Sequence, residues 1–218
     1  MPPEALILAF DTSAAHCAAA LVLGDRLLAE RTEPMATGQA ERLFPMLEAM
    51  LDGAGCRWAD LTAIGVGIGP GNFTGVRLSV SAARGLSLSL DLPTVGVSSL
   101  EALAHGTEGP CVTSLDARQG RLYVQVIDPA HESPPMRCDL ETLPRIPAAP
   151  PPVCIGHRAE EIAARVGGRP QAPRLSLPVA IARIAGTRPA APGGRPAPLY
   201  LRPADAAPPR QAPPVILP

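Results

Sequence analysis

The prolines of this chain divide it into two parts that can support different kinds of structure. Of the 28 prolines among 218 residues, 21 lie from Pro129 onward. Proline lacks a backbone N–H and has a fixed φ, so dense proline excludes central strands and helix interiors. Regular structure is therefore expected mainly in residues 1–128, with short elements and extended connections beyond them.

Residues 6–104 alternate between apolar runs and helical stripes. Short apolar runs bounded by turn residues predict strands, and the dipeptide Gly24-Asp25 predicts a hairpin. Leu and Met at spacings of three and four predict a helix with one apolar stripe. The order βββαβαβα indicates a mixed sheet with helical crossovers. The expected strands are 6–10, 16–23, 26–32, 61–64 and 94–97, and the expected helices are 39–53, 76–90 and 98–104.

A glycine-rich run from Gly65 to Gly75 joins an apolar stretch to a helical one. Such a turn exposes backbone N–H groups at the positive end of the helix dipole, where proteins hold phosphates. The P-loop pattern requires a lysine, and this chain has none, because all 19 basic residues are arginine. The dinucleotide fingerprint also fails, since its third glycine would fall on Pro70, Asn72 or Thr74. Two interpretations stay open, a nucleotide loop of another kind and a structural turn that needs glycine.

The second part of the chain carries fewer signals. A hairpin is expected over 111–127, and short helices are expected over 157–166 and 179–188. We therefore predict an N-terminal lobe, a smaller proline-rich lobe and a poorly ordered tail. Their expected bounds are 1–106, 107–207 and 208–218.

Composition restricts the kind of protein. Hydrophobic residues make up 46% but aromatic residues only 3%, so the core is expected to be aliphatic. A formal net charge of −1 gives no basic excess for tight, direct binding of nucleic acid. The five cysteines form no Cys-x-x-Cys pair, which indicates buried thiols in a reducing cytoplasm. The N-terminus lacks the basic region of a signal peptide, and no stretch reaches the length of a membrane span.

Several long motifs together resemble one family. A three-stranded opening with an Asp-Thr-Ser corner is similar to the ribonuclease-H-like sheet of sugar kinases, Hsp70 and actin. The full set of motifs resembles the TsaB family, which usually has Ser where Asn72 stands. The resemblance is dense over residues 6–128. Its marks are Leu8 to Ser13, Gly69 to Arg77, Arg84 to Leu86, Gly96 to Leu103, Asp116 to Arg118, Tyr123, Ile155-Gly156 and Pro198 to Arg202.

The resemblance implies an α/β, actin-like (ASKHA) fold: a mixed five-stranded sheet with helices, followed by a smaller, degenerate second lobe. It also implies an accessory subunit rather than an enzyme. TsaB proteins are non-catalytic paralogues of TsaD, which transfers a threonylcarbamoyl group to N6 of the adenosine next to the tRNA anticodon. TsaB pairs with TsaD, and the ATPase TsaE docks on that pair. This implies that tRNA is met only within the complex.

The residues support a site without catalysis, metal or cofactor. The catalytic paralogue holds its metal with two histidines four apart on the helix after the third strand, and the corresponding helix here has none. Its carboxylates Glu41 and Glu48 lie about two turns apart, too far to share an ion. Asp11 is interpreted as a strand-end cap, with support of a metal-bound nucleotide as the alternative. The vestigial nucleotide loop is predicted to comprise Asp11, Thr12, Ser13, Gly69, Gly71, Asn72, Thr74 and Gly75.

Two helices are predicted to meet the partner. The stripe of the first helix is typical of core, but the second helix is apolar on more than one face, which suggests a surface for a partner. In the family, this pair packs against the equivalent pair of TsaD, and it can pair two TsaB copies when TsaD is absent. On this prediction, Leu47→Asp or Ala83→Asp abolishes TsaD binding and leaves the chain folded. The predicted interface residues are Leu43, Met46, Leu47, Met50, Leu78, Ala82, Ala83 and Leu86.

The main alternative is a stand-alone metallopeptidase- or ATPase-type enzyme of the same superfamily. It would need a metal constellation or an activated nucleophile, and neither is visible in the sequence. A sugar or acetate kinase would need a larger second domain. Four arginines could contact tRNA directly, but this contact is expected to be weak, because solvated surface charge accounts for them. These arginines are Arg118, Arg121, Arg202 and Arg210.

Overall fold

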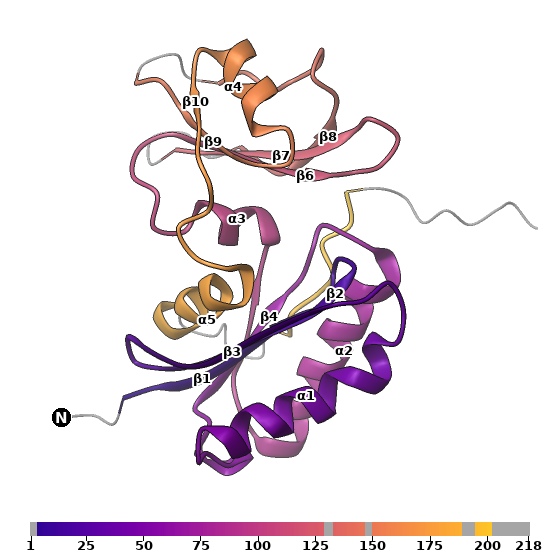
Figure 1. Cartoon of the computed structure of the whole chain (residues 1–218), viewed down its shortest axis with the longest axis vertical. Helices are drawn as coiled ribbons and strands as arrows, with labels where there is room; N and C mark the ends of the chain where they lie inside the picture. Colours follow the sequence, from indigo (N-terminus) through magenta and orange to yellow (C-terminus); the bar gives the residue numbers. More distant parts are fainter. Residues whose placement is uncertain (1–3, 129–132, 147–149, 189–194, 202–218) are drawn as a thin grey trace, which may run out of the picture.

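The computed structural model describes residues 4–128, 133–146, 150–188 and 195–201. These residues form two lobes, each built on one five-stranded sheet (Figure 1). The first sheet has the order β3-β2-β1-β4-β5, and the second has the order β10-β9-β6-β7-β8. The first sheet comprises β1 (Leu6–Asp11), β2 (His16–Leu23), β3 (Arg26–Pro34), β4 (Ala63–Gly67) and β5 (Thr94–Val97). The second comprises β6 (Cys111–Asp116), β7 (Leu122–Ile127), β8 (Met136–Cys138), β9 (Val153–Gly156) and β10 (Arg169–Pro170).

The first sheet is mixed, as the sequence predicts. Strands β1, β2 and β3 are antiparallel neighbours, and the hairpin between β2 and β3 turns at Gly24-Asp25. Strands β4 and β5 run parallel to β1. Parallel neighbours need crossovers, and the helices α1 (Gln39–Gly53) and α2 (Phe73–Leu90) provide them.

Two layers of helices cover the first sheet. Along β1, Leu8 and Phe10 pack with the buried side chains of α1 and α2, whereas Ile7 and Ala9 pack with α5 (Leu177–Thr187). This alternation follows from the two-residue period of a strand. Figure 1 shows α1 and α2 side by side on one face and α5 on the other. The first lobe is therefore a three-layer sandwich with a sheet in the middle.

Part of the glycine run is strand rather than loop, which corrects the sequence interpretation. Gly65 and Gly67 belong to β4, and α2 begins at Phe73 instead of Val76. A Cβ atom on Gly65 would lie 3.1 Å from both the Ala9 and the Ala185 side chains. The missing side chain therefore lets α5 approach the sheet closely.

The second lobe holds more sheet than the sequence predicts. The expected hairpin is present as β6 and β7, but β8, β9 and β10 were not predicted. These strands have two to four residues each, and β10 ends on Pro170, so they carry little periodic signal. The chain therefore forms a second mixed sheet despite its prolines.

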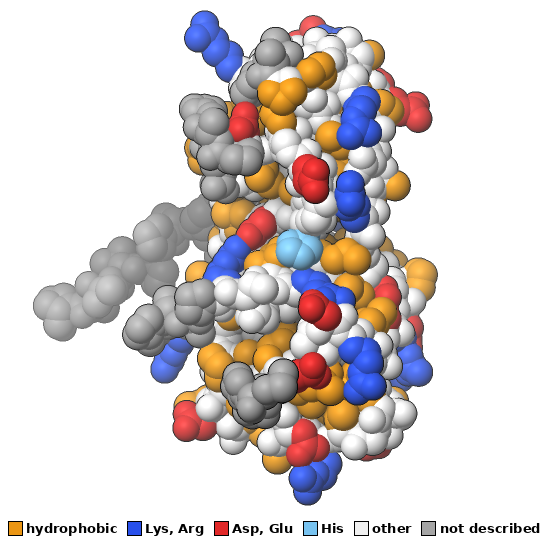
Figure 2. Space-filling model, turned by 90° about the vertical axis from the view of Figure 1, so that its left-hand side faces the viewer, with side chains coloured by type: hydrophobic (Ala, Val, Ile, Leu, Met, Phe, Trp, Pro, Cys, Tyr) orange, Lys and Arg blue, Asp and Glu red, His pale blue; other side chains and the backbone are white. Residues whose placement is uncertain are grey.

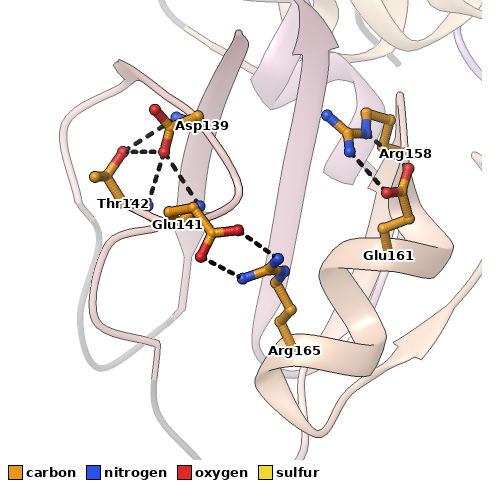
Figure 3. Close-up of polar contacts among 6 residues, drawn as sticks. All are labelled: Asp139, Glu141, Thr142, Arg158, Glu161 and Arg165. Atoms are coloured by element: carbon orange, nitrogen blue, oxygen red, sulfur yellow. Dashed lines mark hydrogen bonds and ion pairs between the residues drawn. The ribbon is translucent and has the colours of Figure 1, made fainter. Parts of the chain in front are cut away.

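The two helices predicted in the second part have different roles. Helix α4 (Ala159–Val166) begins two residues later than expected and packs on the second sheet. Arg165 of α4 bonds both carboxylate oxygens of Glu141, while Asp139 accepts hydrogen bonds from Thr142 in the same loop (Figure 3). Helix α5, in contrast, returns to the first sheet. The boundary at residues 106 and 107 stays a prediction, and the core of the first lobe includes α5.

Helix α3 (Ser99–Ala104) lies between the two lobes. It packs against α5 and against β6, β7 and β9. Leu100 joins a cluster with Ala117 and Tyr123 of the second lobe, and Leu103 packs beside Ile155. The lobes are thus joined by a shared buried helix as well as by the chain.

Buried thiols lead to a first prediction. Burial raises the pKa of Cys17 to about 11, that of Cys111 to about 12 and that of Cys154 to about 11, and it also raises the pKa of Cys138. The thiolate is the reactive form, so these four should resist alkylation at pH 8, whereas the half-buried Cys56 should react. Mass spectrometry after a short iodoacetamide pulse is expected to show one modified cysteine in the native chain and five in urea. Modification of Cys17 as fast as Cys56 would contradict the burial.

Among the described residues, no helix combines the length and the apolarity needed to cross a bilayer.

Candidate functional site

A cavity of about 930 Å³ lies between the lobes, where several predicted motifs meet. Its walls come from the Asp-Thr-Ser corner after β1, the glycine loop before α2, the start of α3 and the β6–β7 hairpin. Leu199, Tyr200 and Leu201 close one side. Pro70 and Gly71 of the loop and Asp116 to Arg118 of the hairpin therefore face the same space.

Asp11 at the corner is held by its own neighbourhood. Its Oδ1 accepts hydrogen bonds from Ser13 N at 3.0 Å and Ser13 Oγ at 2.9 Å, and His16 Nε2 lies 2.9 Å from it. Its Oδ2 is buried with no partner among the described residues. A Cβ on Gly67 would lie 2.0 Å from this oxygen, so the neighbouring strand must carry glycine there. The contacts to Ser13 support the interpretation of Asp11 as a cap of the strand end.

The His16 contact was not anticipated from the sequence. Both Ser13 Oγ and His16 Nε2 are directed at the same carboxylate oxygen of Asp11. In a nucleophile site the imidazole would instead accept the proton of the serine. The three residues therefore do not form the sequence of contacts that activates a serine. Among the described residues, no group of three or more His, Cys, Asp or Glu side chains is placed to hold a metal ion.

The glycine loop is closed by bonds within the chain. The Asn72 N–H donates to Ser13 O at 2.6 Å, and Asn72 Oδ1 accepts from Thr74 N at 3.0 Å and Gly75 N at 3.1 Å. Thr12 Oγ1 donates to Gly75 O at 2.7 Å. Asn72 thus caps α2 with its own side chain, at the place where a phosphate would otherwise accept.

Two glycines let the loop lie against the corner. A Cβ on Gly71 would be 2.3 Å from Ser13 O, and one on Gly75 would be 1.9 Å from Thr12 O. No side chain fits at such distances. The structure thus brings together all the residues predicted for the vestigial loop: Asp11, Thr12, Ser13, Gly69, Gly71, Asn72, Thr74 and Gly75.

The residues predicted for the partner interface occupy a different place from the one expected. Leu43, Met46, Leu47, Met50 and Ala83 are no more than 3% exposed and belong to the core under the first sheet. Ala82 and Leu86 are also buried, and Leu78 is half-buried. Because the apolar stripe faces the sheet, Leu47→Asp or Ala83→Asp is now expected to unfold the chain rather than leave it folded.

A different set of residues forms the outer face of this helix pair. On α1, Phe44 is 40% exposed between the exposed acids Glu41 and Glu48, and Asp52 follows. On α2, Leu88 is 83% exposed. The only charged residues of α2 are Arg77 and Arg84, and both are exposed. The exposed charged side chains are therefore acidic on this side of α1 and basic on α2, and Phe44 and Leu88 are exposed apolar residues beside them in the sequence.

Of the four arginines that could contact tRNA, the structure describes Arg118 and Arg121. Arg118 lies in the β6–β7 turn at the cavity, and Arg121 pairs with Asp139 at 3.2 Å. Arg202 and Arg210, like the tail 208–218, lie outside the described residues. On the face in Figure 2, basic and acidic side chains are interspersed.

Sequence comparison finds a matching family model and related curated proteins. The family model described as "TsaD: tRNA N6-adenosine threonylcarbamoyltransferase" matches residues 33–133. The tRNA threonylcarbamoyladenosine biosynthesis protein TsaB of Escherichia coli (strain K12) is 35% identical over 122 residues, which cover 54% of this chain and 52% of that protein. The chain thus spans about half the length of this curated relative.

Solved structures agree with the fold. A Pseudomonas aeruginosa protein, described as uncharacterized with similarity to peptidase YeaZ, has 27% identity and a TM-score of 0.74, covering 91% of this chain and 100% of its own. The ethanolamine utilization protein EutJ of Carboxydothermus hydrogenoformans has 14% identity and a TM-score of 0.55, covering 84% of this chain and 90% of its own, so it supports the fold alone. The predicted actin-like fold class is therefore confirmed, with a second lobe richer in strands than expected.

Proposed function

Because the chain belongs to the TsaB family, we propose that it is the non-catalytic partner of a TsaD-type enzyme. The relatives named for tRNA threonylcarbamoyladenosine biosynthesis support a role of this chain in that modification. In this proposal the chain pairs with TsaD and supports transfer of the threonylcarbamoyl group to N6 of the adenosine beside the anticodon. The ATPase TsaE docks on that pair, and tRNA binds only in the complex.

The closed glycine loop is the observation that carries the non-catalytic role. In a nucleotide-binding loop, the N–H groups at the helix start are offered to phosphate. Here Asn72 Oδ1 accepts from two of them and Ser13 O from a third. A phosphate would have to displace these bonds, and no lysine exists in the chain to compensate. In this proposal the loop supports the fold, and the partner catalyses the transfer reaction.

We place the partner on the outer face of α1 and α2. Exposed apolar residues beside charges of both signs are typical of the centre and rim of a protein interface. Phe44 and Leu88 supply the apolar part, Glu41 and Glu48 the acidic part, and Arg77 the basic part. A partner with a helix pair of opposite charge order would match it. A second copy of this chain meets the same condition in the absence of TsaD.

Reconstitution tests the function. Purified chain, TsaD and TsaE are mixed with tRNA and the threonylcarbamoyl-adenylate intermediate, and modified adenosine is measured by mass spectrometry. We expect modification only when this chain and TsaD are both present. Modification with the chain omitted, or turnover by the chain alone, would reject the proposal and favour a stand-alone enzyme.

The interface leads to a second prediction. Phe44→Asp is expected to weaken TsaD binding about 30-fold, because a central aromatic contact contributes about 2 kcal/mol. The variant should stay folded, since the side chain is already 40% exposed. Calorimetric titration measures the affinity. Leu27→Asp on β3, where the leucine is 43% exposed, is the matched control and should bind as the unmodified chain does. Equal affinities of the two variants would remove Phe44 from the interface.

A further inference from the structure

Two sequence motifs that lie far apart meet at the outer face of α2. Tyr200 lies 123 residues after Arg77 in the sequence. It belongs to the segment 195–201, which we name the strap. Arg77 Nε donates to Tyr200 Oη at 2.7 Å, and its guanidinium carbon lies 3.7 Å from the centroid of the Phe73 ring. The Phe73 and Tyr200 rings are 5.0 Å apart. Arg77 is therefore held by a hydrogen bond and by a cation–π contact together.

The strap holds the second arginine of α2 as well. Arg84 Nε donates to Pro196 O at 2.8 Å. The strap is itself fixed to the end of β4, because Leu199 N donates to Ile68 O at 2.8 Å. The strap is drawn in yellow beside α2 in Figure 1. Arg77 and Arg84 thus each donate a hydrogen bond to the same segment.

The spacing of these arginines puts both on the same side of α2. Residues seven apart on a helix lie two turns apart on nearly the same side, so Arg77 and Arg84 are separated by about 10 Å along the axis. Both are exposed, and among the described residues neither has a carboxylate partner. The strap's acceptors bond the Nε of each arginine, and within the described part of the chain the terminal Nη groups have no hydrogen-bond acceptor. A carboxylate accepts two such N–H groups at once.

Fixing an arginine before binding lowers the cost of binding. A mobile arginine loses about 2 kcal/mol of rotamer freedom when it is immobilised. The strap removes part of that freedom in the free chain, which is the usual advantage of preorganisation.

We propose that the strap is a positioning element of the partner interface. It holds Arg77 and Arg84 ready for two carboxylates of the partner that lie about 10 Å apart. The inference rests on the proposed function, because it takes TsaD as the occupant of the helix pair. The acidic groups of TsaD face α2 rather than α1, since α2 carries no acid and the outer face of α1 carries Glu41, Glu48 and Asp52.

A double-mutant cycle between Tyr200 and Arg77 tests the inference. Tyr200→Phe removes the hydroxyl and keeps the ring, so the fold is expected to survive. We expect Tyr200→Phe to weaken TsaD binding 3- to 10-fold and Arg77→Gln 10- to 30-fold, with the double variant no weaker than Arg77→Gln alone. Arg77→Gln should also reduce the salt dependence of binding. Arg169 is an exposed arginine of the second lobe, so Arg169→Gln is the charge control. It should change neither the affinity for TsaD nor the salt dependence of binding.

The outcomes separate the two proposals. If the unmodified chain does not bind TsaD, the proposed function fails. If it binds and Tyr200→Phe binds equally well, or if the two substitutions add independently, the strap has no positioning role and the inference is overturned. Equal melting temperatures of Tyr200→Phe and the unmodified chain exclude unfolding as the cause of a loss.

Discussion

Leu47→Asp is expected to abolish the folded state. Leu47 is 0% exposed and packs under the first sheet in the same cluster as Leu8 and Phe10. Removing a buried leucine side chain costs about 2–5 kcal/mol, and an unpaired buried carboxylate adds several more. The sum is comparable with the whole stability of a typical domain, about 5–15 kcal/mol. Circular dichroism during urea unfolding should show no cooperative transition for this variant.

Phe44→Asp is the matched control on the same helix. Phe44 lies three residues from Leu47, but its side chain is 40% exposed, so an added charge stays in water. It should retain a cooperative transition close to that of the unmodified chain. If Leu47→Asp also kept such a transition, α1 could not pack with its Leu and Met stripe on the sheet.

Gly75→Ala is expected to destabilise the chain by about 3 kcal/mol, through overpacking and the loss of a buried hydrogen bond. The new Cβ would lie 1.9 Å from Thr12 O, a backbone atom that a rotamer change cannot move. Separation of the two segments also breaks the bond from Thr12 Oγ1 to Gly75 O. For a chain of this size, the midpoint of thermal unfolding should fall by about 6–12 °C.

Gly85→Ala, on the same helix, is the control, and it is expected to raise the free energy of unfolding rather than lower it. A Cβ at Gly85 meets no atom within 4 Å, so alanine should stabilise α2 by up to about 1 kcal/mol. Thermal unfolding followed by circular dichroism compares the two variants directly. A similar shift of both midpoints would mean that the contact between the loop and the corner is not tight.

The order of elements in the first lobe could be predicted because it depends on local patterns. The bounds of α1 follow from its apolar period and from glycine at its end, and they agree with the structure. The period does not tell what covers the stripe. Leu43 and Leu47 were therefore assigned to a partner, although the sheet of the same chain covers them.

The parts that could not be predicted depend on contacts between distant residues. The bond between Arg77 and Tyr200 spans 123 residues, and neither residue type indicates the other. The contact of His16 with Asp11 depends on how the corner closes. Strands β8 and β10 are too short for a period and exist because neighbouring strands offer them hydrogen bonds. In each case the tertiary structure, and not local preference, decides the outcome.

The return of α5 to the first sheet has a consequence for synthesis on the ribosome. In the described part of the chain, the face of β1 that carries Ile7 and Ala9 is covered mainly by α5, residues 177–187. When all five strands and the crossover helices of the first lobe have left the ribosome, this apolar face of the nascent chain is still exposed to water. The residues of the second sheet are synthesised after β5 and before α5. Vectorial folding therefore cannot finish the lobe that emerges first until most of the other has appeared.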